Sequence, residues 1–432
     1  MISFVHTADV HFGVENYGRI DAATGLNSRL LDFYKAFQEC INRALDERVD
    51  LFIFAGDAYK TAHPTPTQQR LFMQSLLRLF RAHIPVVIVV GNHDNALSFG
   101  KAHALEIFGQ IPLDGFYVIS QPTSLQIMTR QGPVNIVGIP WPARAHVALH
   151  KDHALLSGPE LAQAMSATVS ELISQYAQQL DPQIPAILVG HLTVSSGIFS
   201  GSEKRAICGT DPIFLPSQLS VAPFDYVALG HLHRYQVVNR GEYPEIVYSG
   251  SIERVDFGER KEEKGFCLGK IHAKGTTEHT FIPVKTRPLV QVHVSCNDTE
   301  DITTQIIAHL ERYTLTDAIV KIVYQVPPGS SDKVDVAALH AACRGVHYLA
   351  GIIPLKQFAA AKRYTGASLH DVSLSTLLRT YLDAKNIGPE RVEVMMKKAA
   401  LIADEQGMSL DSSCSYGFGV GSGVPEGSCD TQ

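Results

Sequence analysis

The sequence has no paired cysteines, no basic excess and no long apolar run. Its seven cysteines are odd in number, scattered and never spaced as CxxC, which argues against a disulfide framework and a thiolate zinc site. No apolar run approaches the roughly 18 residues that span a membrane. The N-terminal residues MISFVHTADVH lack the basic and apolar regions of a secretory signal. We therefore expect a soluble, reduced protein of the cytoplasm.

The composition is that of ordinary globular domains. Of 432 residues, 45% are hydrophobic and 19% are charged, so the chain can bury a large core. Its length suggests two or three domains of about 150 residues each. The formal net charge of −6 gives no sign of a strongly basic nucleic-acid-binding surface, and by itself it counts against DNA or RNA as a partner.

Residues 1–282 repeat a pattern in which a short apolar run ends in polar residues. Near-continuous apolarity is typical of strands buried on both faces. The strands that we expect are Ile2–Val5, Asp50–Ala55, Pro85–Val90, Val134–Ile139, Ala186–Val189, Tyr226–Leu229 and Ile246–Tyr248. Helical periodicity predicts helices over Leu30–Leu45, Thr67–Arg81 and Pro159–Leu180. Alternating strands and helices indicate a layered α/β domain.

Three smaller parts follow a proline-containing boundary at Phe281–Pro288. Residues 288–357 predict a small α+β domain with strands Leu289–Val294, Ile319–Val326 and Val346–Ile353 and helices Asp301–Tyr313 and Val336–Cys343. Residues 366–407 predict two amphipathic helices, with a capping box at Ser368–Asp371 and a break at Gly388-Pro389. These helices could pack on their own domain or dock on a partner. Residues 408–432, rich in Gly and Ser, predict a disordered tail.

Polar groups follow five of the predicted strands. They are Asp9-Val10-His11, Gly56-Asp57, Gly91-Asn92-His93-Asp94, Gly190-His191 and Gly230-His231-Leu232-His233. Ligands of open α/β sheets bind at the carboxyl ends of the strands, so we expect the five groups to converge. Each fragment alone could be a cap or an ordinary turn, but all five in order make coincidence improbable.

Carboxylate, imidazole and amide ligands without cysteine suit divalent ions such as Mn²⁺, Fe²⁺ or Zn²⁺. The side chains are numerous enough for two ions. Two ions ~3.5–4 Å apart clamp the attacking and leaving oxygens of a displacement at phosphorus and activate a water. Such a centre needs no Ser or Cys nucleophile.

These motifs resemble the metallophosphoesterase superfamily, whose pattern is D-x-H, G-D, G-N-H-[DE], G-H and G-H-x-H. The segments Val247–Glu259 (VYSGSIERVDFGE) and Glu263-Lys-Gly-Phe266 narrow the resemblance to the SbcD family of bacterial break-repair nuclease subunits, over residues 1 to about 270. This resemblance implies a layered β-sandwich core flanked by helices. It also implies a DNA-capping domain at 288–357 and an ATPase-binding segment at 366–407.

The resemblance implies a role for each motif residue. Three would hold one ion: Asp9, His11 and His233. Three would hold the other: Asn92, His191 and His231. Asp57 would bridge both ions. His93 would stabilise the transition state and help protonate the leaving oxygen, and Asp94 would orient His93 by accepting its other N–H.

The implied activity is that of a 3′–5′ exonuclease on double-stranded DNA and an endonuclease on hairpins and single strands. The family's usual ion is Mn²⁺. Its members work in DNA repair, recombination and replication with a coiled-coil ATPase of the SbcC type, in a heterotetramer built on a nuclease homodimer. Two bound divalent ions would add roughly +4 at the cleft. The net charge of −6 is then only a weak argument against DNA as a partner. We expect the isolated subunit to bind DNA weakly.

Some positions and alternatives stay open. Lys60 stands where relatives commonly carry His or Asp, and it could contact a phosphate or be solvated. We expect His6 to be a buried, hydrogen-bonded histidine, and Trp141 to be a packing residue or to line the cleft.

One rival function is a phosphoprotein phosphatase or small phosphodiester hydrolase, although Gly56-Asp-Ala-Tyr-Lys-Thr lacks the Arg of the phosphatase motif GDxVDRG. Another is a DNA-end tethering module whose metals only shape a surface.

Overall fold

The computed structural model describes residues 1–95, 101–110, 114–142, 156–201, 211–297, 301–326, 332–356, 373–385 and 387–405. The chain divides into two compact units, 1–356 and 357–432. The first unit contains both the predicted α/β domain and the predicted α+β domain. The boundary that we expect between them at 282–288 stays a prediction.

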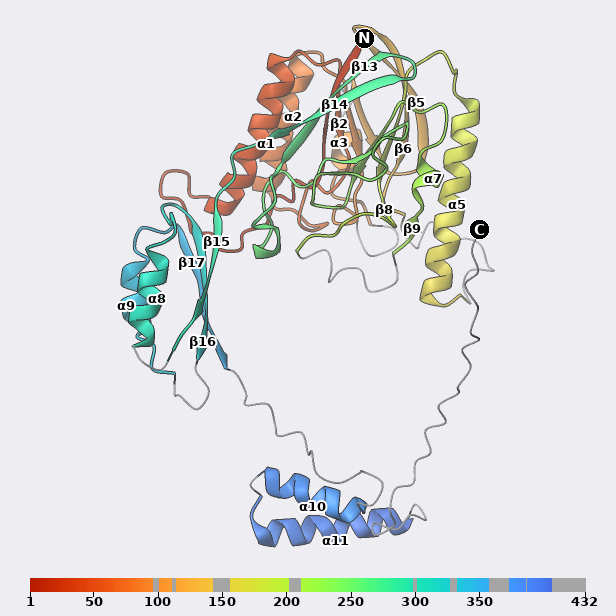
Figure 1. Cartoon of the computed structure of the whole chain (residues 1–432). Coiled ribbons are helices and arrows are strands. Elements are labelled where there is room, and N and C mark those ends of the chain that lie inside the picture. Colours follow the sequence, from red (N-terminus) through yellow and green to blue (C-terminus); the bar gives the residue numbers. More distant parts are fainter. Residues whose placement is uncertain are drawn as a thin grey trace, which may run out of the picture. The chain divides into compact units, whose positions relative to one another are not determined.

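Two six-stranded sheets form the core of the first unit (Figure 1). The first has the order β14-β13-β1-β2-β3-β4, with β1 Ile2–Thr7, β2 Leu51–Phe54, β3 Val86–Val89, β4 Phe116–Ile119, β13 Gly265–Ala273 and β14 Thr276–Pro283. The second has the order β11-β12-β10-β7-β6-β5, with β5 Thr123–Thr129, β6 Gly132–Ile139, β7 Ala186–His191, β10 Tyr226–Gly230, β11 Gln236–Val237 and β12 Ile246–Tyr248. Two short strands, β8 Thr193–Val194 and β9 Ile213–Phe214, pair separately.

Helices cover the outer face of each sheet, which makes the core a four-layered sandwich. Helices α1 (Ser28–Asp46) and α2 (Pro66–Arg81) pack on the first sheet, and α5 (Gly158–Gln179) packs on the second (Figure 1). Apolar side chains of both sheets meet between them, including Ile53 and Val189, both fully buried. Two shorter helices, α3 (Glu106–Gln110) and α7 (Pro216–Leu219), lie beside the sheets. The predicted layered α/β fold is confirmed.

The seven predicted strands and three predicted helices of this region are present. Strands β2 and β3 are buried along their whole length, as continuous apolar runs predict. The pattern did not reveal β4, β5, β13 and β14. Strand β14 at the sheet edge alternates exposed and half-buried residues and carries Thr, Glu and His, so it lacks an apolar run.

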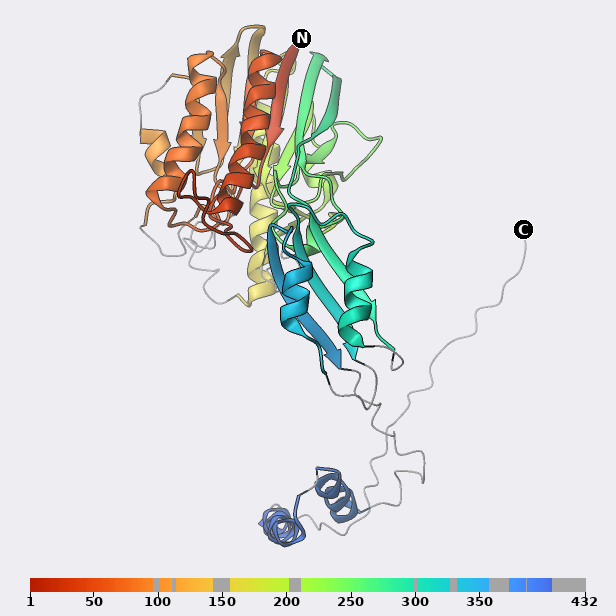
Figure 2. The same cartoon turned by 90° about the vertical axis from the view of Figure 1, so that its left-hand side faces the viewer.

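A three-stranded parallel sheet follows the core in the chain. Its order is β15 (Leu289–Ser295), β16 (Ile319–Val326) and β17 (Tyr348–Lys356). Helices α8 (Ile302–Leu310) and α9 (Val336–Ala342) lie together on one of its faces (Figure 2). All five predicted elements are present, with β17 beginning two residues after the predicted start.

The second unit contains two helices, α10 (Leu374–Ala384) and α11 (Pro389–Glu405). Ser373 caps α10 by accepting a hydrogen bond from the backbone N–H of Thr376. The predicted capping box at Ser368–Asp371 and the tail at 408–432 lie outside the described residues. Pro389 begins α11, as predicted.

Two expected absences can be checked on the described part of the chain. No described helix is long and apolar enough to cross a membrane. The four described cysteines, Cys40, Cys267, Cys296 and Cys343, are free.

A buried ion cluster joins α1 to the linker before β15. Asp32 accepts two hydrogen bonds from Arg287, each of 2.7 Å, and one of 3.0 Å from Arg29. Arg29 is fully buried and Asp32 nearly so. Arg287 also donates to the backbone carbonyl of Asp317, just before β16, at 3.0 Å. Paired, charge-assisted hydrogen bonds of this kind connect the small sheet to the core.

Replacing Asp32 with Ala should lower the free energy of unfolding by about 3–5 kcal/mol, because the buried Arg29 loses its hydrogen-bonded carboxylate and keeps only that of Glu253, at 3.9 Å. The measurement is urea unfolding followed by circular dichroism. Glu47→Ala is the control, since it removes an ion pair with Arg43 in which both side chains are more than 40% exposed. Such a pair contributes about 0–1 kcal/mol. If both variants lost the same free energy of unfolding, the buried cluster would stabilise the fold no more than an exposed ion pair does.

Candidate metal centre

The structure brings the side chains of all five motifs together at the carboxyl ends of the strands. Asp9 and His11 follow β1, and Asp57 follows β2. The group Asn92–Asp94 follows β3. His191 ends β7 in the other sheet, and His231 and His233 follow β10. The site therefore lies across the edge of both sheets.

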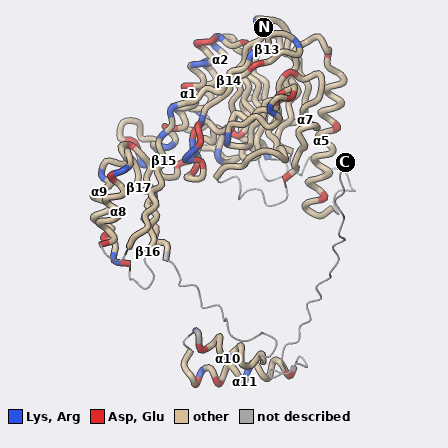
Figure 3. The backbone as a smooth tube through the Cα atoms, viewed as in Figure 1, with Lys and Arg blue, Asp and Glu red and all other residues tan. Residues whose placement is uncertain are grey.

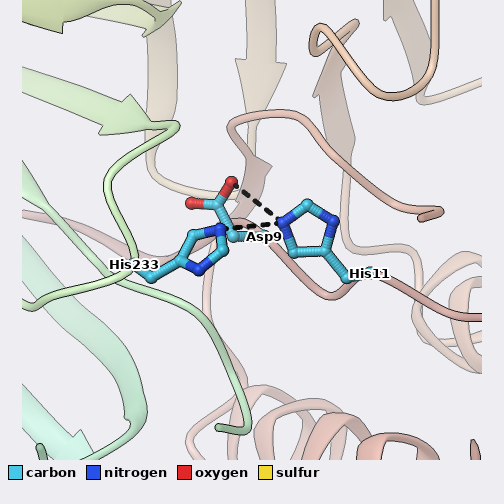
Figure 4. Close-up of side chains that lie close together, drawn as sticks. All are labelled: Asp9, His11 and His233. Carbon is cyan, nitrogen blue, oxygen red and sulfur yellow. Dashed lines mark hydrogen bonds and ion pairs between the residues drawn. The ribbon is translucent and has the colours of Figure 1, made fainter. Parts of the chain in front are cut away.

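Asp9, His11 and His233 form the first group of side chains that could hold a cation (Figure 4). The Nε2 atoms of His11 and His233 lie 3.0 Å apart, and Asp9 Oδ1 is 4.0 Å from His11 Nε2. His233 donates its Nδ1–H to Glu259 Oε1 at 2.8 Å, which leaves a lone pair on Nε2. A cation between the two imidazole nitrogens would accept both lone pairs, so the donors fit a metal ion.

Asn92, His191 and His231 form a second group. Asn92 Oδ1 lies 2.9 Å from His191 Nε2 and 3.2 Å from His231 Nδ1. His191 donates its Nδ1–H to the carbonyl of Ala55 at 2.7 Å, so the neutral ring, the form that binds a cation, would carry its lone pair on Nε2. These are nitrogen and oxygen donors suited to a divalent ion.

Asp57 lies between the two groups. Its Oδ2 is 3.7 Å from His11 Nε2 and 3.4 Å from His191 Nε2. Asp57 is nearly completely buried. A carboxylate in this place can contact ions held by either group.

The backbone at the site adopts conformations that most residues avoid. The φ angles of Asp9, His11, Asp57 and His231 are 52°, 49°, 59° and 97°. Non-glycine residues in such conformations cost of order 1–3 kcal/mol each and concentrate at functional sites. The surrounding core must hold them in place.

Two motif glycines allow the close approach of these segments. Gly56 has a φ of 97°, and a Cβ there would lie 2.3 Å from His191 Nδ1. A Cβ on Gly91 would lie 2.1 Å from Asp57 Oδ1. Neither position has room for a side chain, which explains the glycine before Asp57 and before Asn92.

Burial and neighbouring opposite charges shift the pKa values of the carboxyl and imidazole groups of the site. Burial raises the pKa of Asp9 to about 7. Burial would also raise the pKa of Asp57, but His191, His93 and His11 outweigh it and hold that pKa well below its usual value. Burial would lower the pKa of His191, but Asp57 outweighs it and the pKa rises to about 9. Buried carboxylates among imidazoles are the charge arrangement that a bound cation compensates.

His93 lies at the rim, with 34% of its side chain exposed. It donates Nδ1–H to the backbone carbonyl of Lys60 at 3.0 Å, and its Nε2 is 4.0 Å from Asp57 Oδ2. Burial lowers the pKa of His93. The imidazole can thus reach a bound substrate while one nitrogen is held in place.

Asp94 does not orient His93, so that expectation is wrong. Its carboxylate accepts backbone N–H groups of Asp57, Ala58, Tyr59 and Gly91 at 2.9–3.3 Å. The backbone carbonyl of Lys60 accepts the hydrogen bond from His93 Nδ1 instead. Asp94 is fully buried, and it fixes the loop that carries Asp57.

Sequence reasoning assigned no role to Glu259 and Lys264, which support His233. Glu259 Oε1 accepts from His233 Nδ1, and Lys264 Nζ is 2.9 Å from Glu259 Oε2 and 2.8 Å from the carbonyl of His233. Burial opposes ionisation of Glu259, but Lys264 and His233 outweigh it and hold its pKa well below the usual value. Both residues belong to the segments that carried the family resemblance, but spacing alone does not show their contact with His233.

The structure shows the surroundings of the three residues whose roles the sequence left open. His6 is fully buried, with Nδ1 3.2 Å from the Tyr226 hydroxyl and Nε2 3.1 Å from the carbonyl of Leu229. Burial lowers its pKa to about 3, so it is neutral, as expected for a buried, hydrogen-bonded histidine. Lys60 is half-buried beside His93. The ring of Trp141 has its centroid 4.8 Å from that of His231.

Comparisons with known proteins agree on the type of domain. Residues 2–235 match the model of the calcineurin-like phosphoesterase family. The chain is 28% identical over 306 residues to the D subunit of the nuclease SbcCD from Staphylococcus epidermidis, covering 70% of this chain and 74% of that relative.

Among solved structures, a dimetal phosphatase from Danio rerio aligns with a TM-score of 0.38 and 10% identity. The protein TT1561 of Thermus thermophilus aligns with a TM-score of 0.33 and 12% identity. Each alignment covers 65% of this chain and 98% of the other. These TM-scores are too low to add to the family match.

Glu259→Gln should weaken Mn²⁺ binding about 10- to 100-fold, because His233 loses its carboxylate partner. Electron paramagnetic resonance of free Mn²⁺ measures the affinity, and circular dichroism verifies the fold. Glu262→Gln is a matched control, since Glu262 also contacts Lys264, at 3.0 Å. The same loss of affinity in both variants would show that the Mn²⁺ affinity depends on the charge balance at Lys264 and not on the contact between Glu259 and His233.

Proposed function

This chain belongs to the calcineurin-like phosphoesterase family, as its motifs predicted, and we propose that it is a two-metal-dependent DNA nuclease subunit. The observation that carries the proposal is the convergence of its carboxylate, imidazole and amide groups around places for two cations. The similarity to a relative named as a nuclease subunit supports the choice of DNA as substrate.

In this proposal each group of side chains holds one ion. Asp9, His11 and His233 bind the first, and Asn92, His191 and His231 bind the second. Asp57 bridges them, which its distances of 3.7 Å and 3.4 Å to one imidazole of each group support. Mn²⁺ is the ion that we propose for this set of nitrogen and oxygen donors. When bound, the two ions polarise the phosphodiester and activate a water.

His93 acts on the leaving group. Its position at the rim and the hydrogen bond of its Nδ1 to Lys60 leave Nε2 for the substrate. From there its doubly protonated form stabilises the transition state and donates the Nε2 proton to the leaving oxygen, which leaves the neutral ring with its Nδ1–H on Lys60. Asp94 acts by holding the loop of Asp57, which positions the bridging carboxylate.

The full activity that we propose is 3′–5′ exonuclease action on double-stranded ends and endonuclease action on hairpins and single strands, in DNA repair and recombination. Residues 288–357 cap the DNA. Helices α10 and α11 bind an SbcC-type coiled-coil ATPase in a heterotetramer built on a nuclease homodimer. Exposed apolar side chains on these helices support the docking role: Leu374, Leu377, Tyr381, Leu401 and Ile402.

The charge distribution fits a subunit that depends on its ions and partner for DNA affinity. Positive and negative residues are interspersed over the core and do not form one basic block (Figure 3). With a net charge of −6, the isolated chain offers little of the phosphate neutralisation on which DNA affinity depends.

Substitution of His93 tests the catalytic step. His93→Leu should lower cleavage of linear duplex DNA about 10²- to 10⁴-fold, the usual contribution of general acid–base catalysis. Mn²⁺ binding should be kept, because His93 is not a ligand in this proposal. His272→Gln is the control, since His272 is exposed on β13. Unaltered function of His93→Leu would favour a tethering role in place of cleavage.

A comparison of substrates and metal removal tests the class of reaction. With Mn²⁺ and the partner ATPase and ATP, the protein should hydrolyse duplex DNA and bis-p-nitrophenyl phosphate but not a phosphopeptide. A chelator should abolish both reactions. Equal release of nucleotides in EDTA would refute the metal-dependent mechanism, and preference for the phosphopeptide would favour a phosphatase.

A further inference from the structure

A cavity of about 420 Å³ adjoins the candidate metal centre. It is lined where β3, β4 and β6 end and by helix α3. Two lining residues connect it to the site. Asn95 directly follows the motif that ends in Asp94, and Trp141 lies between the cavity and His231, with its ring tilted by 35° to the imidazole at 4.8 Å. A group bound in the cavity would therefore lie beside a substrate at the metal centre.

The lining combines an aromatic surface with neutral polar groups. The side-chain amides of Asn95, Gln110 and Gln121 and the hydroxyl of Ser120 can each donate and accept hydrogen bonds. One lysine, Lys101, and one glutamate, Glu106, offset each other in charge. The described part of the lining therefore offers no net positive charge for a phosphate, whereas it suits a flat, neutral ring with polar edges.

His103 adds an unsatisfied polar group to this lining. Its Nδ1 is buried and has no hydrogen-bond partner among the described residues. A buried ring nitrogen without a partner costs free energy, which a ligand recovers only when the His103 ring turns toward the cavity. Burial lowers the pKa of His103, so it is a neutral imidazole that can either donate or accept.

We propose that this cavity binds the nucleobase of the nucleotide whose phosphodiester lies at the metal centre, with Trp141 stacking on the base. Stacking on an aromatic ring accepts any base, while amide groups contact its polar edge. The inference rests on the proposed nuclease function, which supplies a substrate with a base next to the reacting phosphate. Trp141 is then a positioning residue and has no part in the chemical step.

Trp141 reports on the cavity directly, because it is the only tryptophan in the chain. Its fluorescence should be quenched saturably by deoxyadenosine monophosphate in the presence of Mn²⁺. Deoxyribose 5-phosphate, which keeps the sugar and phosphate but lacks the base, should quench far less at equal concentration. Equal quenching by both compounds, or none by deoxyadenosine monophosphate, would overturn the proposal.

Kinetics with two esters of the same leaving group test the same point independently. The wild type should prefer the p-nitrophenyl ester of thymidine 5′-phosphate to bis-p-nitrophenyl phosphate in kcat/KM. Trp141→Ala should reduce that preference about 5- to 150-fold, mainly through KM, and Trp141→Phe should restore part of it. Gln121→Ala should reduce it several-fold through the lost edge contact. Gln175→Ala, an exposed position on α5, is the matched control.

These experiments distinguish a failure of the base-binding proposal from a failure of the proposed nuclease function. Hydrolysis of both esters and of DNA, with a preference that Trp141→Ala does not change, refutes the base pocket and leaves the nuclease standing. Base-dependent quenching without any DNA cleavage supports the pocket and refutes the nuclease.

Discussion

The structure depends on keeping carboxylates and imidazoles together in a place that is almost wholly shielded from solvent. Asp9 and Asp57 are almost wholly removed from solvent, and the nitrogen atoms of His11 and His233 lie 3.0 Å apart. Such an arrangement is costly without a compensating charge, and it persists only where rigid elements hold it. Two mixed sheets supply that rigidity, since the five motifs sit directly at the ends of their buried parallel strands. The left-handed backbone of the ligand residues and the tight glycines before them are consequences of the same requirement.

A second layer of buried charge surrounds this centre. Glu259 and Lys264 contact His233 on the side away from the centre. Asp94 holds the Asp57 loop through three backbone N–H groups and its own loop through a fourth, that of Gly91. These groups are themselves buried, so each must satisfy its hydrogen bonds within the fold. The orientations of His191 and His233 follow from such contacts: with Nδ1 held by the carbonyl of Ala55 or by Glu259, Nε2 faces the site. The same principle places His93 at the rim, where the carbonyl of Lys60 fixes its ring.

The motifs predicted which side chains lie close together because each one directly follows a buried apolar run. Strand ends in parallel sheets meet at one edge, so residues as distant as Asp9 and His233 were expected together. The same reasoning did not find the antiparallel edge strand β14, whose exposed polar residues give no apolar signal. It also assigned Asp94 the wrong partner. Local spacing puts Asp94 next to His93, whereas the turn of the backbone directs its carboxylate to the loop after β2.

The amino-acid sequence was enough to predict the buried strands, the long helices, the family and the candidate metal-binding residues, because buried apolar runs and short polar motifs are local properties. The nitrogen with which each imidazole faces the centre, and the charged residues that contact these imidazoles, follow from the tertiary structure alone. It also placed Trp141 between His231 and a polar cavity. These relations join residues from separate strands and loops, so they depend on how the two sheets pack and cannot be read from neighbours in the chain.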